Sequence, residues 1–488
     1  MKKDRMLLGI DLGTSSVKLC LMNDQGTSCQ VVKAEYPMIG TENGLYEQRP
    51  EDWLRAIAGA AKMIISPEVG ERICAIGFSA QMPTLVVSTP DGAPLNNAIV
   101  WCDPRAEDQG KELLKLWGEE RHYKQTGIVL DGRYIITMAR WLSENSGVDF
   151  SKDYKLLSAK DYLCLKFTGN AVTDPSTASG FGVYSIQSGD WDGELCSEAQ
   201  LDVKHLPEIR DSAAVAGSLS EDAANLLGIR PGTPVITGCA DSVCGVLGMG
   251  AQKSGTACQM WGSGTAIILV TERPVYSPER RYFITPLARP ETYGAEADIL
   301  STGAGAEWFY KLMGTQIFEA ARKAPSGSED LLFYPYLSGG EQGVLWDSEL
   351  QGGILGLNTR HGPEHIARGL LEGMCFEVRR CIEAFQKGGC HFSESLCTGP
   401  FSREPFFMQM LADILSAPCS AVYEENSSAL GAAYIAGIGV GVWKFEDIMM
   451  MAAGGGKTYT PNNDKTTAYN QYYERYIKNT GKIKPIEK

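Results

Sequence analysis

Residues 9–21 constrain the fold of this chain more than any other stretch. An apolar run at 6–10 reaches Asp11 and a Gly-Thr-Ser corner, and an alternating run at 17–22 follows. This order of residues predicts a buried strand, a tight turn and a second strand. The chain therefore begins with a β-hairpin that carries a carboxylate at its turn.

The hairpin turn has the chemical groups of a phosphate site. Gly13 allows close approach of the backbone to a ligand, and Thr14 and Ser15 offer hydroxyl and amide donors. The Asp11 carboxylate has the chemistry to hold a hydrated divalent ion. An ordinary hairpin with its carboxylate in water is the alternative, and this stretch alone leaves both open.

Length and charge narrow the class of protein. A chain of 488 residues is too long for one core, so two large domains are expected. The net charge of −14 disfavours nucleic acid as a partner, so any phosphate must be held by local donors or a metal. No apolar run approaches the ~18 residues that span a bilayer, and the N-terminus lacks a signal-peptide pattern. The 14 scattered cysteines, with no CxxC spacing, are typical of buried thiols in the cytoplasm.

The order of the predicted strands and helices indicates an α/β protein with a weak internal repeat. Residues 260–270 repeat the plan of 9–21, with a Gly/Ser/Thr corner that leads into a strand. We expect an N-terminal domain at 1–250, a C-terminal domain at 251–450 and a helical tail at 451–488. Helices are predicted at 51–65, 108–117, 133–144, 154–167, 363–386, 406–415 and from 428, short strands at 73–78, 85–87, 98–101 and 235–237, and a polar loop at 173–180.

Three segments directly after buried strands carry polar side chains, where open α/β sheets bind ligands. Asp241 follows the strand at 235–237, and its carboxylate could take a proton from a substrate hydroxyl or be a simple turn residue. Residues 79–84 and 101–105 follow two further strands, although Arg105 could also pair with Asp103 on the surface.

Two motifs resemble ligand-binding sites, but each lacks a feature that such a site requires. Residues 454–458 resemble a P-loop, but Met451 stands where the first glycine is required. His361 and His365 are four residues apart, but Gly-Pro between them breaks the helix that would align them on zinc. With five histidines and none beside a plausible nucleophile, a His-based hydrolase is disfavoured.

Several ordered motifs resemble the FGGY carbohydrate kinases of the actin-like ATPase superfamily, over about residues 6–450. Residues 9–15 are similar to that family's first phosphate motif, and 352–357 with 365–373 are similar to its C-terminal signature. Residues 409–414 and 429–433 resemble its adenosine-side motifs. The resemblance implies two ribonuclease-H-like domains, with ATP and a sugar bound in a cleft between them.

The resemblance also implies roles for individual residues. Asp241 matches the catalytic base and Asp11 the carboxylate on the Mg²⁺ side. The base would take the proton of a sugar hydroxyl, whose oxygen then attacks the γ-phosphate of ATP in line. The implied nucleotide-binding residues are Thr14, Ser15, Lys18, Ser263, Gly264, Thr265, Gly303 and Gly399, and the implied substrate-binding residues are Gln81, Met82, Pro83, Trp101, Asp103, Arg105 and Ser242.

The departures from the family pattern concern mainly the substrate. Pro83 stands where xylulokinases have a sugar-binding His, and Ser242 where they usually have Asn. Met82 with Pro83 also differs from the Arg-Glu of glycerol kinases. The segments at 138–141 and 399–401 depart from the signature lysine and from the usual glycines near the adenine.

The sequence therefore predicts a kinase that uses ATP and Mg²⁺, with D-xylulose as the leading substrate. Other ketoses such as ribulose, polyols such as erythritol, and sugar acids stay open. So do an actin- or chaperone-like nucleotide switch and a sugar sensor that has lost activity. A homodimer is expected only by resemblance, with no nucleic-acid or membrane partner.

Overall fold

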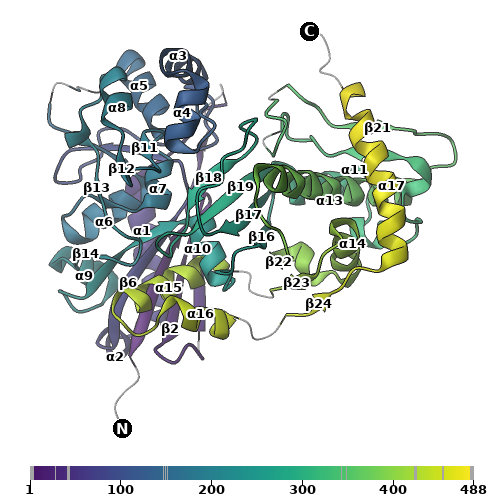
Figure 1. Ribbon diagram of the computed structural model, residues 1–488. Coiled ribbons are helices and arrows are strands. Elements are labelled where there is room, and N and C mark those ends of the chain that lie inside the picture. Colours follow the sequence, from purple (N-terminus) through teal and green to yellow (C-terminus); the bar gives the residue numbers. More distant parts are fainter. Residues whose placement is uncertain are drawn as a thin grey trace. The chain divides into compact units, whose positions relative to one another are not determined.

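The computed structural model describes residues 5–27, 29–40, 44–146, 148, 150, 152–341, 343–347, 349–422, 426–452 and 456–483 (Figure 1). The chain forms two compact units. The N-terminal unit comprises Met1–Gln252, Ile284–Tyr293 and Asn426–Ala452, and the C-terminal unit comprises Lys253–Phe283, Gly294–Glu425 and Ala453–Lys488. This grouping differs from the expected boundaries, because 426–452 belongs with the N-terminal unit and the tail with the C-terminal one. Among the described residues, no helix has both the length and the apolar character needed to cross a membrane.

The main sheet of the N-terminal unit confirms the hairpin predicted at the start of the chain. Strand β1 pairs antiparallel with β2 and parallel with β6, and β15 pairs parallel with β6. The order across the sheet is β14 (Val215–Ser218), β15 (Pro234–Ala240), β6 (Ile73–Ala80), β1 (Met6–Leu12), β2 (Ser16–Asn23) and β3 (Cys29–Glu35). The carboxyl ends of three parallel strands therefore meet at one edge.

Helices cover both faces of this sheet. On one face, α1 (Pro50–Ile64) and α6 (Ala159–Thr168) pack on Leu8, Ile10 and Phe78, which form one core with Trp53 and Tyr162. On the other face, α15 (Ser427–Gly439) lies beside β6 and α10 (Asp241–Gly248) (Figure 1). A Cβ on Gly9 would lie 2.4 Å from the Ala429 carbonyl oxygen, so α15 lies almost directly on the backbone of β1.

A second, smaller sheet and a short helix that follows it in the chain each correct one prediction. It has the order β4 (Ile39–Gly40), β5 (Tyr46–Gln48), β8 (Ala98–Ile99), β7 (Leu85–Ser88) and β9 (Lys155–Ser158). The helix predicted over 154–167 is wrong at its start, because residues 155–158 pair with β7 and Ser158 caps α6. The loop predicted at 173–180 is wrong too, since Asp174 caps the short helix α7 (Pro175–Ser179).

The remaining elements of the N-terminal unit surround these sheets. They are α2 (Pro67–Gly70), α3 (Glu107–Trp117), α4 (Glu119–Thr126), α5 (Ile135–Asn145), β10 (Val172–Thr173), β11 (Tyr184–Ser185), β12 (Asp190–Trp191), α8 (Gly193–Glu198), β13 (Glu208–Ile209), α9 (Glu221–Leu227) and α16 (Phe445–Ala452).

The main sheet of the C-terminal unit repeats the strand pairing of the N-terminal unit, as the internal repeat at 260–270 predicted. Strand β16 (Thr256–Trp261) pairs antiparallel with β17 (Thr265–Thr271) and parallel with β22 (Glu394–Thr398), as β1 does with β2 and β6. The further elements are β19 (Tyr293–Ile299), α11 (Gly303–Met313), α12 (Ile317–Ala321), β20 (Leu332–Tyr334), β21 (Gly353–Leu355), α13 (Pro363–Gly388), α14 (Pro405–Leu415), β23 (Cys419–Ala421), β24 (Thr458–Tyr459) and α17 (Asn463–Asn479). Strand β18 (Phe283–Pro286) begins at the last residue of the segment 253–283, and its other residues belong to the N-terminal unit.

Candidate active site

The carboxyl ends of β1, β6 and β15 bring the first predicted residues together. In the strand register Asp11 lies opposite Ser79, Leu12 lies opposite Ala80, and Ala80 in turn lies opposite Ala240. Asp241 follows directly as the first residue of α10. The two predicted carboxylates therefore lie at the same edge of one sheet.

The Asp11 carboxylate is buried and has a defined environment. Its Oδ1 accepts a hydrogen bond of 2.7 Å from Ser79 Oγ, and Lys18 lies opposite it on β2. Burial raises the pKa of Asp11, while the charge of Lys18 and the hydroxyl of Ser79 act in the opposite direction. Lys18 therefore faces Asp11 and favours its charged form.

Tyr36 is a member of this site that the sequence did not indicate. Its hydroxyl donates to the Gly13 carbonyl oxygen. Burial raises the pKa of the Tyr36 phenol, and the negative charges of Asp11 and Asp241 raise it further. The phenol consequently stays protonated, within the electrostatic reach of both carboxylates.

The Gly-Thr-Ser corner forms the tight turn between β1 and β2. The Gly13 amide donates to the Ser16 carbonyl at 3.0 Å, and Ser15 is exposed at the tip. Trp101 Nε1 donates to Thr14 Oγ1 at 3.1 Å, and Gln48 Nε2 donates to the Thr14 carbonyl at 2.6 Å. The corner predicted to hold phosphate is therefore tied to the predicted substrate residue Trp101.

Gln81 and Gln48 form a buried amide pair beside this corner. Gln81 Nε2 donates to Gln48 Oε1 at 2.8 Å, and Trp53 Nε1 donates to the same oxygen at 3.0 Å. Among the described residues, the buried Gln81 Oε1 has no hydrogen-bond partner. Met82 and Pro83 come next in the chain and are half-buried. Gln48 carries no motif, so the sequence could not reveal its role.

Asp103 and Arg105 form an ion pair, but a buried one. Arg105 Nε and Nη2 each lie 2.8 Å from an Asp103 oxygen, and Nη2 also lies 2.8 Å from Glu47 Oε1. The guanidinium stacks over Trp141, with its central carbon 5.0 Å from the ring centroid. The sequence had left open a surface pair, whereas Asp103 is fully buried and Arg105 almost so. Ser242, on the first turn of α10, donates its backbone amide to Asp241 Oδ1 at 2.9 Å.

In the C-terminal unit, the predicted nucleotide residues also converge. Ser263 and Gly264 form the turn between β16 and β17, and the Ser263 carbonyl accepts from the amides of Thr302 and Ala304 at 2.9 and 3.0 Å. This places Gly303, at the start of α11, on the turn. Thr265 Oγ1 lies 2.9 Å from Thr302 Oγ1, and a Cβ on Gly399 would lie 2.1 Å from the Trp261 carbonyl oxygen. The backbone of three segments therefore meets at the end of β16.

The departure at 399–401 has a packing explanation. Residues 400–403 form a short 3₁₀ helix, and the Phe401 ring is buried 5.2 Å from the ring of Trp261 and 5.1 Å from that of Phe407. The unusual residues thus contribute to the core beneath the predicted nucleotide pocket.

The two misleading motifs also have places in the structure. Helix α13 begins at Pro363, so His361 lies outside the helix that holds His365. The P-loop-like segment at 454–458 lies partly outside the described residues. Within the part of the chain that the structure describes, no three His, Cys, Asp or Glu side chains gather as a metal site.

Family comparison decides the identity of the fold. The family model for the N-terminal domain of the FGGY family of carbohydrate kinases matches residues 6–248, and the model for the C-terminal domain matches residues 259–440. The chain belongs to this family. The kinase prediction is thereby confirmed, and the FGGY chain is an ATP-dependent carbohydrate kinase with the two-domain fold of sugar kinases.

Relatives of this FGGY chain carry different substrate names. A xylulose kinase of Bacillus subtilis is 29% identical over 445 residues, covering 90% of this chain and 89% of that protein. A gluconokinase of the same organism is 26% identical over 481 residues, covering 95% and 93%. The crystal structure of a ligand-bound xylulose kinase from Lactobacillus acidophilus has a TM-score of 0.91 at 26% identity, with 98% of each chain covered.

Proposed function

We propose that this kinase phosphorylates a ketopentose hydroxyl, with D-xylulose as the leading substrate, xylulose 5-phosphate as its product and Asp241 as the general base. The observation that carries the proposal is the position of Asp11 and Asp241 at the carboxyl ends of β1 and β15, the two strands that flank β6 in the same sheet. One carboxylate there can serve the phosphate side and the other the acceptor hydroxyl.

The reaction is an in-line displacement. The Asp241 carboxylate takes the proton of the sugar hydroxyl, and the sugar oxygen forms a bond to the γ-phosphorus. The bond from that phosphorus to its bridging oxygen breaks, and ADP leaves with the bonding pair. In the N-terminal unit, Thr14 and Ser15 offer hydroxyl and amide donors for the charge that develops on the phosphoryl oxygens. The family resemblance gives the turn at 263–265 of the C-terminal unit the role of the second phosphate loop.

Mg²⁺ fits the donor set on the phosphate side. Asp11 is a hard oxygen ligand at a strand end, and Lys18 favours its charged form. Because one carboxylate does not complete a coordination shell, the phosphates of ATP would supply further ligands. When bound, the ion would neutralise charge on the phosphates.

The charges around the predicted substrate residues support a neutral sugar. The Arg105 guanidinium is neutralised by Asp103, and Glu47 adds a second carboxylate, so this cluster carries a net negative charge. A sugar acid would need an available cation here, whereas a ketose or polyol would not. D-xylulose leads because Gln81 and Met82 match the xylulokinase pattern and because two of the relatives above are xylulose kinases. Ribulose and erythritol are the next candidates, since Pro83 and Ser242 depart from that pattern.

A coupled ADP-release assay tests the proposal. The panel contains D-xylulose, D-ribulose, L-ribulose, L-xylulose, erythritol, gluconate and glycerol with MgATP, and Asp241→Ala serves as the blank. We expect one strong responder among the neutral sugars, with turnover lost in Asp241→Ala. A strong response to gluconate would overturn the charge argument, and turnover in Asp241→Ala would overturn the assignment of the base. The proposal includes a homodimer by family resemblance, which light scattering of the purified protein tests.

A further inference from the structure

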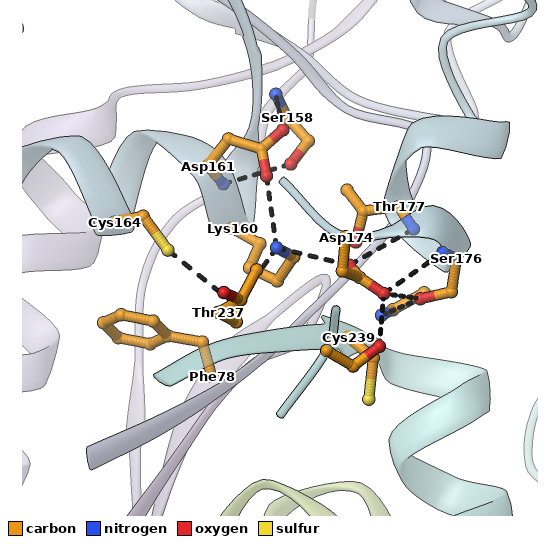
Figure 2. A network of polar contacts seen from close by, with 12 residues as sticks. Phe78, Ser158, Lys160, Asp161, Cys164, Asp174, Ser176, Thr177, Thr237 and Cys239 are labelled. Carbon is orange, nitrogen blue, oxygen red and sulfur yellow. Dashed lines mark hydrogen bonds and ion pairs between the residues drawn. The ribbon is translucent and has the colours of Figure 1, made fainter. Parts of the chain in front are cut away.

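A buried charged cluster lies beside the strand that leads to Asp241 (Figure 2). Lys160 Nζ lies 3.2 Å from Asp161 Oδ1 and 3.3 Å from Asp174 Oδ1, and all three side chains are at most 1% exposed. Burial disfavours the charged amine, but the two aspartates outweigh it and raise the pKa of Lys160, so the ammonium persists. Burying three charges is costly, and the proposed chemistry uses none of them.

The cluster contacts β15 through two hydrogen bonds. Lys160 Nζ donates to the Thr237 carbonyl oxygen at 3.1 Å (Figure 2). The Ala240 amide donates to Ser176 Oγ at 3.0 Å. Ser176 Oγ in turn donates to Asp174 Oδ2 at 2.6 Å. The carboxylate of Asp174 therefore holds both groups that contact the end of the strand.

These two contacts are made where β15 leaves the regular ladder. The register with β6 shifts between Ile236 and Cys239, and Gly238 has a φ of +75°. A Cβ on Gly238 would lie 2.0 Å from the Phe78 carbonyl oxygen, so the irregular backbone lies tightly on β6. A bulge of this kind turns the end of a strand and re-aims the residues that follow. Residues 237–240 thus depend on side chains for part of their hydrogen bonding.

We infer that Lys160, Asp174 and Ser176 are positioning residues that fix the bulged end of β15 and, through it, the carboxylate of Asp241. Asp241 is covalently joined to Ala240, whose amide is held by Ser176. A displacement of about 1 Å in a catalytic group can lower the rate about 100-fold. Contacts that fix the position of Asp241 should therefore raise kcat. The inference rests on the proposed role of Asp241 as base.

The test compares two buried serines of the same cluster in the full-length enzyme. Ser176→Ala removes the acceptor of the Ala240 amide. Ser158→Ala is the matched control, because Ser158 is equally buried and its Oγ accepts from the Asp161 amide at 3.1 Å, whereas among the described residues no hydrogen bond joins this hydroxyl to β15. Lys160→Met removes the hydrogen bond from Lys160 to the Thr237 carbonyl oxygen, and its kcat is measured if the variant folds. If it does not fold, the comparison of Ser176→Ala with Ser158→Ala decides the test.

We expect Ser176→Ala to lower kcat about 10- to 100-fold, with the KM values for ATP and for the responding sugar within about twofold of wild type. Ser158→Ala should keep kcat within about threefold at a similar melting temperature. Equal kcat losses in the two variants, or a wild-type kcat in Ser176→Ala, would refute the positioning role. Asp241→Ala in the same assay separates the two ideas. If it is inactive while Ser176→Ala is fully active, only the positioning inference fails; if it keeps turnover, the base assignment fails.

Discussion

His122 should make the N-terminal unit sensitive to mild acid. Its ring is fully buried and stacks on Trp117 with centroids 5.1 Å apart, and Nε2 lies 2.8 Å from the Gly182 carbonyl oxygen. Among the described residues, its buried Nδ1 has no hydrogen-bond partner. Nε2 therefore carries the proton, and a second proton on Nδ1 would find no acceptor. Burial lowers the pKa of His122 from its ordinary 6.5 to about 4, although the Gly182 carbonyl and Asp192 favour the charged form.

The sign and size of the effect follow from proton linkage. The folded state binds the proton more weakly than the unfolded state, so the contribution of His122 to stability is present above pH 6.5 and is lost as the pH falls toward 4. Between pH 7.5 and 5.5 the loss amounts to about 1.4 kcal/mol in the free energy of unfolding.

Urea denaturation of wild type and His122→Phe at these two pH values measures the effect. Phenylalanine keeps a ring against Trp117 but does not titrate, so the variant should lose about 1.4 kcal/mol less than wild type on acidification. His391→Phe at an exposed position is the control and should behave as wild type does. Parallel losses in wild type and His122→Phe would refute a buried neutral imidazole.

Three further predictions concern the site itself. Trp101→Phe removes the donor to Thr14 Oγ1 and should lower kcat/KM for the sugar about fivefold in steady-state assays, while an unchanged value would contradict the link. Arg105→Lys cannot reproduce the two-pronged contact with buried Asp103 and should lower the urea unfolding free energy by about 2 kcal/mol; a loss below ~0.5 kcal/mol would contradict it. Asp11→Asn should lower kcat about 100-fold and raise the Mg²⁺ concentration needed for half-maximal ADP release; an unchanged Mg²⁺ requirement would exclude Asp11 as a ligand.

Local patterns in the sequence predicted much of the fold. The hairpin at 9–21 has the signals of alternation and a Gly-Thr-Ser turn, and the helix from Pro363 has a proline at its first position. The predicted helix over 154–167 failed at its start, because Lys155, Leu156, Leu157 and Ser158 form a segment too short for its pattern to distinguish a strand from a helix. Their pairing with β7, about 70 residues earlier in the chain, decides the outcome.

The candidate site was partly accessible from sequence. Asp11 and Asp241 stand after buried strands, and that position is a recognisable signal. Tyr36 and Gln48 act through contacts with Gly13 and Thr14 across the sheet edge, and nothing in their local sequence shows it. The burial of Lys160 has no clear signal in the sequence, because its helix also carries Asp161 and Lys166, and a lysine in such a segment usually faces solvent.

The position of helix α15 in the sequence determines when the N-terminal unit can finish folding during translation. Strand β1 leaves the ribosome first, yet α15, which packs on the backbone of β1 at Gly9, consists of residues 427–439. At about 5–20 residues per second, roughly 20 to 80 seconds of translation separate the two. During that time α15 cannot pack on the N-terminal sheet, and a fragment that ends near residue 250 would lack this helix permanently. The first domain of this kinase is therefore completed late in synthesis, and it cannot be released as a separate module by a single cut.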